Sequence, residues 1–236
     1  MRLLAFILMI WAVPLASQTL GQSAMVFDRA APQWRAVGLV DVGGVGSCTG
    51  VLIADDLVLT AAHCVVEEGT RAAVRAEHIR FKAGWAHGAA VADRAVAKVV
   101  AHPGYSVKGG HHGQDIALIQ LQTPIRDPRI VPLRIGHTAT TGALVGLVSY
   151  SHLNEVMPRI EEGCQLMARR GDTLVASCDV SFGASGAPLF AWVEGRPQIT
   201  GVVSAMAQMN GAPVALGASV RAHLTELLAG LGRSRL

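Results

Sequence analysis

Short apolar runs recur along the chain, and glycine, proline and aspartate separate them, as they commonly do between β-strands. Two breaks fall inside longer runs, at Asp55–Asp56 and at Glu194–Pro197, and each predicts a turn between two strands. Many short strands at such spacing are typical of a β-barrel or a β-sandwich. The runs cover residues 36–42, 50–62, 94–103, 115–121, 143–150, 173–178, 187–205 and 212–220.

The last pattern has a helical period. In "SVRAHLTELLAGL", the side chains of Val220, Leu224, Leu227 and Leu228 fall on one face, and Gly230 follows near the end. We therefore expect one helix to close an otherwise all-β chain.

The first apolar run has the pattern of a signal peptide. Arg2 precedes an apolar run over 3–16, and small residues follow. The alternative is an uncleaved membrane anchor. The run is shorter than the roughly 20 residues that a spanning helix needs, and Pro14 lies near its end, so the signal peptide is favoured.

We place the signal peptide at 1–21, with cleavage after Ala16, Gly21 or Ala24 as open alternatives. Residues 22–33 then form a possible short propeptide. Export predicts a secreted or periplasmic protein with no stable membrane insertion after cleavage.

Composition and charge narrow the class of protein. The chain has 236 residues, of which 51% are hydrophobic and 26 are glycine, which favours a turn-rich β protein over a helical bundle. A net charge of +3 without an arginine-rich tract gives no reason to expect a nucleic-acid partner.

Four cysteines form two pairs that are close in sequence, Cys48 with Cys64 and Cys164 with Cys178. Three connectivities are possible, and the local one is favoured. Residues 164–178 read as a hairpin with its turn at 170–172, which would place the last two cysteines side by side. A zinc site is the alternative, but the spacings do not resemble one.

His63 ends a strand-like run in "VLTAAHCVV" and stands beside Cys64. A lone histidine is usually structural. This one is a candidate general base, because a disulfide at the next residue would fix the direction of its ring.

Asp115 opens an apolar run in "HHGQDIALIQL". It is either a turn residue or an acid that orients an imidazole. His111 and His112 beside it are a weak candidate for a metal site, and exposed loop histidines are the commoner case.

Ser185 stands between small residues in "GASGAPLF", where it is either a turn residue or a nucleophile. The order His63, Asp115, Ser185 is one of the known orders of a catalytic triad. Each residue alone is a weak signal, and the three together are a strong one.

The sequence resembles the trypsin-fold (chymotrypsin-like) serine proteases, most of all the bacterial glutamyl-endopeptidase-like (V8-like) branch. The resemblance runs from about Trp34 to Leu228. It rests on "SCTGVLIADDLVLTAAHCVV", "VAHPGY", "DIALIQL", "CDVSFGASGAPLF" and "ITGVVSAMA".

The resemblance implies Ser185 as nucleophile, His63 as general base and then acid, and Asp115 as the orienting acid. It implies an oxyanion hole from the backbone N–H groups of Gly183 and Ser185. It also implies two antiparallel six-stranded β-barrels with the active site in the cleft between them. With a boundary near 138–142, we assign these barrels to 34–140 and 141–236.

Two positions depart from the family pattern. Ala184 stands where the family often has Asp or Asn, so the ion pair that matures pancreatic-type enzymes cannot form. Ala187 stands where Gly or Ser is more common.

The candidate specificity pocket contains Asp179, Val180, Ser204 and Met206. Asp179, six residues before Ser185, would favour substrates with Arg or Lys if it lay at the pocket floor. An apolar preference is the equal alternative, since Ser204–Met206 carries no charge. His152 is the only candidate near the cleft for recognition of glutamate, and the sequence does not place its loop.

These signals together predict a secreted, monomeric serine endopeptidase that acts on peptides or proteins, without cofactor or metal. One alternative is a catalytically inactive homologue that binds proteins through the same fold. Another is an adhesion module based on the "RGD" at 170–172, which a hairpin turn explains better.

Overall fold

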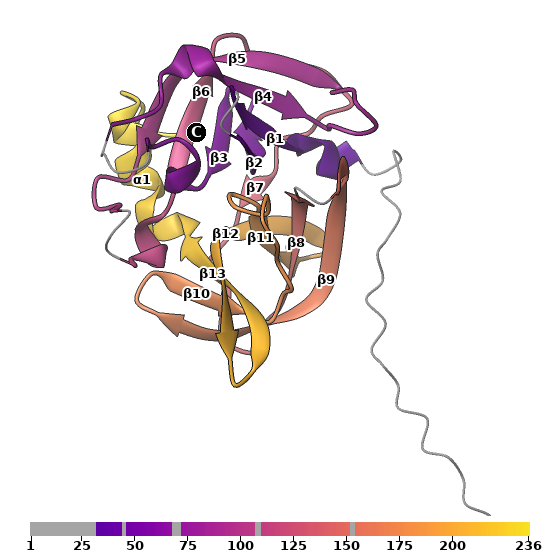
Figure 1. The fold of residues 1–236 in the computed structure, drawn as a ribbon, viewed down its shortest axis with the longest axis vertical. Helices are drawn as coiled ribbons and strands as arrows, with labels where there is room; N and C mark the ends of the chain where they lie inside the picture. Colours follow the sequence, from indigo (N-terminus) through magenta and orange to yellow (C-terminus); the bar gives the residue numbers. More distant parts are fainter. Residues whose placement is uncertain (1–31, 44–45, 68–71, 107–109, 152–153) are drawn as a thin grey trace, which may run out of the picture.

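The computed structural model describes residues 32–43, 46–67, 72–106, 110–151 and 154–236. The expected signal peptide, the first ten residues of the possible propeptide, and His152 lie outside these residues. Figure 1 shows two β units, one above the other, with a helix beside them. Within the described residues, no helix has the length and apolar character needed to cross a membrane.

The first half of the chain forms a closed barrel of six antiparallel strands. They are β1 Val37–Val42, β2 Gly46–Ala54, β3 Leu57–Thr60, β4 Ile79–Ala83, β5 Ala92–Ala101 and β6 Ala117–Leu121. Their order around the barrel is β1-β2-β3-β6-β5-β4. In β4, Ile79 and Phe81 are buried while Arg80 between them is exposed, the period-two pattern of a strand with one face on the core. The predicted turn at Asp55–Asp56 joins β2 to β3.

The second half forms another ring of strands. The elements are β7 Arg134–Ile135, β8 Leu144–Ser151, β9 Asn154–Arg170, β10 Thr173–Ala176, β11 Pro188–Val193, β12 Arg196–Met209 and β13 Ala212–Ser219. Because β11 pairs with both β8 and β12, six of them close in the order β11-β8-β9-β10-β13-β12. The two six-stranded barrels are as predicted. The short β7, which was not predicted, adds parallel to β12.

Both local disulfides are present, Cys48–Cys64 and Cys164–Cys178. The hairpin between the second pair is also as predicted: Arg170 of β9 pairs with Thr173 of β10 across a turn at 171–172. The "RGD" tripeptide therefore belongs to this hairpin turn.

The predicted C-terminal helix, α1, spans Val220–Gly230. It follows the second barrel but packs against strands of both, namely β5, β6 and β12. The expected apolar face needs one correction. His223 is buried on this face, whereas Leu224 is only half-buried.

Four short 3-10 helices complete the described fold: η1 Pro32–Ala36, η2 Ala62–Cys64, η3 Ala76–His78 and η4 His112–Gln114. Trp34 of η1 packs on Phe190 at a ring-centroid distance of 4.8 Å and edge-on to Trp192 at 6.2 Å. This contact anchors the entry into the first barrel against β11 of the second barrel.

Candidate active site

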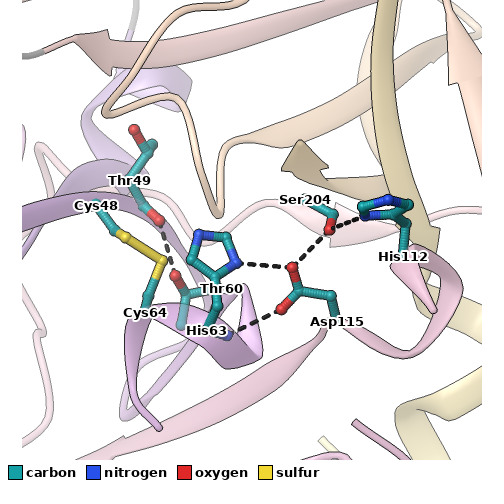
Figure 2. A network of polar contacts seen from close by, with 8 residues as sticks. All are labelled: Cys48, Thr49, Thr60, His63, Cys64, His112, Asp115 and Ser204. Atoms are coloured by element: carbon teal, nitrogen blue, oxygen red, sulfur yellow. Dashed lines mark hydrogen bonds and ion pairs between the residues drawn. A yellow bond between two sulfur atoms is a disulfide. The ribbon is translucent and has the colours of Figure 1, made fainter. Parts of the chain in front are cut away.

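The imidazole of His63 is placed by β3 and by a disulfide. The buried strand β3 ends at Thr60, and η2 carries His63 directly after it. Cys64, the next residue, is bonded to Cys48 of β2, and Figure 2 shows the histidine beside this bond. The local backbone around His63 is thus held from two strands of the first barrel.

Asp115 follows η4 and is 4% exposed. Its Oδ1 accepts the backbone N–H of His63 at 2.9 Å, and its Oδ2 lies 2.7 Å from Nδ1 of the same residue. An ionised carboxylate only accepts, so Nδ1 of His63 carries the proton. In the neutral ring, Nε2 is then the unprotonated nitrogen and is able to take a proton.

Ser204 of β12 adds a third contact to this carboxylate. Its hydroxyl donates to Oδ2 of Asp115 at 2.5 Å (Figure 2). Because that proton is used, Nδ1 of His112, 3.1 Å from the same hydroxyl oxygen, is the donor in their contact. His112 thus has a partner within the hydrogen-bond network.

Two opposing effects act on the pKa of Asp115. Burial is the largest and raises it, since a desolvated carboxylate is disfavoured. Hydrogen bonds from His63 and Ser204, together with the charge of His63, outweigh burial and hold the pKa of Asp115 below its ordinary value. The ionised acceptor that orients His63 is therefore the stable form.

Ser185 lies in a sharply bent loop before β11. Gly183 and Gly186 have φ values of +97° and +82°, which glycine adopts without a steric penalty. A Cβ at Gly186 would come within 2.1 Å of the carbonyl oxygen of Thr49, so the loop packs directly on the first barrel. In the described part of the chain, the backbone N–H groups of Gly183 and Ser185 have no hydrogen-bond acceptor.

His63 and Ser185 line one cavity of about 800 Å³ between the barrels. Its second-barrel wall is mainly apolar and carries no charged side chain among the described residues. The lining residues on that wall are Val180, Ser181, Phe182, Gly183, Ser185, Val203, Ser204, Ala205 and Met206.

Asp179 is not among the described residues that line this cavity. Its backbone N–H donates to Oε1 of Glu161 at 3.1 Å, and its carboxylate lies 3.9 Å from the guanidinium of Arg159. The carboxylate that would favour basic substrates is therefore turned toward β9, while the other three candidate pocket residues line the cavity.

Two groups of side chains in the described residues have the spacing of a metal site. In the first, Cys48 and Cys64 are consumed by their disulfide. In the second, His102, His223 and Glu226, the Nδ1 of His102 accepts the N–H of Gly104. Nε2 of His102 then carries the proton that it donates to Glu226 at 3.1 Å, a hydrogen-bonded rather than a metal-ligating tautomer.

Two β-barrels that meet at an Asp–His pair and a glycine-bracketed serine define the class of trypsin-fold serine proteases. Comparison with known proteins agrees. The family model described as "Trypsin" matches residues 27–223, and the chain belongs to this family of serine endopeptidases.

Two known proteins are similar to this chain. It is 26% identical over 192 residues to chymotrypsin-like elastase family member 1 of Canis lupus familiaris, covering 70% of this chain and 72% of that protein. A solved structure of a Glu endopeptidase in complex with MPD aligns with a TM-score of 0.73 at 22% identity, over 89% of this chain and 96% of that one. The latter likeness concerns the fold.

The sequence did not predict two hydrogen bonds at this site. Ser204 was named for the pocket but not as a donor to the Asp115 carboxylate. Thr49, whose hydroxyl lies 2.8 Å from the carbonyl of Gly183, was not named as a site residue. Both contacts join segments far apart in sequence, 89 residues for Ser204 with Asp115 and 134 for Thr49 with Gly183. No local pattern predicts such pairs.

Proposed function

We propose that the protein is an exported endopeptidase whose triad is Ser185, His63 and Asp115. The observation that carries this proposal is the buried carboxylate of Asp115, which holds both the backbone N–H and Nδ1 of His63. That histidine shares a cavity with Ser185.

In this mechanism the Ser185 hydroxyl oxygen attacks the substrate carbonyl carbon while Nε2 of His63 takes the hydroxyl proton. The carbonyl electrons move to oxygen, and the N–H groups of Gly183 and Ser185 stabilise the negative charge. When the C–N bond breaks, His63 returns the proton to the leaving amine. A water molecule then repeats the sequence on the acyl-enzyme and releases Ser185.

For the substrate residue before the cleaved bond, we propose a small or medium apolar side chain. The second-barrel wall offers apolar contacts around Val180 and Val203, and Met206 at its edge is 46% exposed. A charged side chain buried against this wall would find no charged partner on it, because Asp179 faces Arg159, and the carboxylate of Glu67 lines the cavity from the first-barrel side. A positional scanning library tests this: cleavage after Ala, Val or Leu should exceed cleavage after Arg, Lys or Glu, and a basic or acidic preference would contradict it.

We also propose export through the N-terminal signal and action as a monomer without a nucleic-acid partner. The two disulfides support an oxidising compartment. N-terminal sequencing of the exported protein tests the leader and any propeptide together. Because Ala184 has no carboxylate to pair with a newly formed N-terminal ammonium, activity should not depend on the mature chain beginning at one particular residue. A sharp requirement for one particular N-terminal residue would contradict this expectation.

Peptide hydrolysis by the Ser185→Ala variant tests the triad. The rate should fall by several orders of magnitude, since the nucleophile is lost while the fold is kept. Near wild-type hydrolysis by this folded variant would refute the assignment. An inactive wild-type protein would favour the protein-binding homologue instead.

A further inference from the structure

Thr49 is a fully buried residue of β2 whose N–H and hydroxyl face the serine loop, the loop before β11 that carries Gly183 and Ser185. Its backbone N–H donates to the carbonyl of Ser185 at 2.8 Å, and its hydroxyl lies 2.8 Å from the carbonyl of Gly183. Its own carbonyl accepts the hydroxyl of Thr60 at 2.8 Å, a contact drawn in Figure 2. One residue of the first barrel therefore holds two carbonyls of the loop that belongs to the second.

The direction of the Thr49 hydroxyl bond is fixed by a fourth contact. The backbone N–H of Tyr150 in β8 donates to the same hydroxyl oxygen at 3.0 Å. A hydroxyl has one proton, and the carbonyl of Gly183 can only accept, so the proton points to Gly183. Every polar atom of Thr49 is thus used, and its side chain joins three segments.

These contacts bracket one peptide unit, the one between Ala184 and Ser185. The preceding unit, between Gly183 and Ala184, is held at both ends: the Thr49 hydroxyl donates to its carbonyl, and its N–H donates to the carbonyl of Ser181. The following unit, between Ser185 and Gly186, is also held at both ends. The Thr49 N–H donates to its carbonyl, and its N–H donates to the carbonyl of Val203. Because peptide units are planar, fixing both neighbours fixes the direction of the unit between them.

The bracketed unit carries the Ser185 N–H. Its carbonyl, that of Ala184, accepts from the N–H of Ala187 at 2.9 Å, whereas its N–H has no acceptor among the described residues. Gly183 itself can adopt many backbone conformations, so its carbonyl would turn readily if the Thr49 hydroxyl were absent. The other bonds to the two neighbouring units come from Ser181 and Val203 of the second barrel. The two bonds from Thr49 come from the first barrel, which carries His63 and Asp115.

We propose that the Thr49 hydroxyl is a positioning group that keeps the Gly183–Ser185 backbone directed at the developing oxyanion. The inference rests on the proposed function, because it assigns a task only if Ser185 is the nucleophile. Thr49 itself does not touch the substrate. It acts through the backbone N–H groups, so its loss should affect the transition state more than substrate binding.

The test compares Thr49→Val, which removes the hydroxyl and keeps the shape, with Thr49→Ser, which restores it. Removing an oxyanion donor outright costs about 10²–10³ in kcat, so misdirecting donors should cost less, about ten- to a hundredfold in Thr49→Val. KM should change little, and Thr49→Ser should recover most of kcat.

Thr200→Val is the matched control. Thr200 is also buried, and its hydroxyl accepts the backbone N–H of Ala139 at 2.6 Å, away from the serine loop. This variant should lose stability in thermal unfolding but keep kcat. All assays are run below the unfolding transition of each variant.

A second readout separates positioning from general destabilisation. The affinity of a substrate-matched peptidyl trifluoromethyl ketone, whose adduct places an oxyanion at the site, should weaken in Thr49→Val by the same factor as kcat/KM. Affinity for the intact substrate, measured in the Ser185→Ala background, should be unchanged by Thr49→Val.

The possible results separate the proposed protease function from the positioning role of Thr49. A wild-type protein that neither cleaves peptides nor reacts with a fluorophosphonate overturns the proposed function. An active wild type with a folded Thr49→Val variant of near-normal kcat overturns the role of Thr49 alone. The role of Thr49 is also overturned if Thr49→Ser does not recover activity, or if Thr200→Val loses as much kcat as Thr49→Val.

Discussion

The two disulfides allow a controlled test of how the first barrel positions its histidine. Cys48–Cys64 and Cys164–Cys178 join residues separated by 16 and 14 positions. The chain-entropy expression assigns each closed loop about 3 kcal/mol of stabilisation of the folded state. Replacing either pair by alanine should therefore lower the free energy of unfolding by a similar amount, measured as the shift of the urea midpoint.

Activity should respond differently, because the first pair adjoins His63 while the second lies two residues before Val180 of the cavity wall. The C48A/C64A variant should lose about ten- to a hundredfold in kcat, the cost of slight misplacement of a catalytic group. The C164A/C178A variant should mainly raise KM. Wild-type kcat in folded C48A/C64A would refute the idea that this disulfide positions His63.

Three further predictions follow from single contacts. Asp115→Asn should lower kcat by about 10⁴ through the wrong histidine tautomer, and kcat within tenfold of wild type would contradict this. Gly186→Ala should be severely destabilised, because its Cβ would lie 2.1 Å from the Thr49 carbonyl oxygen at a φ of +82°, and a Tm near wild type would contradict this. Burial, followed by the charge of His223, lowers the pKa of His102, so its contribution to stability is present above about pH 6.5 and is lost as pH falls through the folded pKa. His102→Gln should accordingly lose less Tm than wild type between pH 7.5 and 5.5, and an equal loss would contradict this.

The sequence predicts most of the strands, the terminal helix and the two disulfides, because these follow from local periodicity and close cysteine pairs. It does not predict β4, the first part of β9, or β7. Strand β7 is only two residues long and exists through pairing with β12. It also places Leu224 rather than His223 on the buried face of α1. That histidine lies against His102 of the β5–β6 connection, at a ring-centroid distance of 4.3 Å, a contact that helical period alone does not contain.

The candidate site likewise contains residues that local sequence patterns predict and one whose position depends on the path of a loop. His63, Asp115 and Ser185 stand in local patterns that the sequence displays. The structure brings the first two into contact and places Ser185 in the cavity that His63 lines. Asp179 was placed at the possible pocket by counting from Ser185. Counting does not determine the loop path, and its contacts with β9 direct the side chain elsewhere.

The most direct test of the central claim is to map the adduct of a fluorophosphonate on the folded wild-type protein by peptide mass spectrometry. One adduct at Ser185 is predicted, which should disappear on denaturation and in His63→Ala, because the serine reacts only when the histidine accepts its proton. No labelling of the folded protein, or labelling at another residue, would contradict the assignment of Ser185 as the nucleophile.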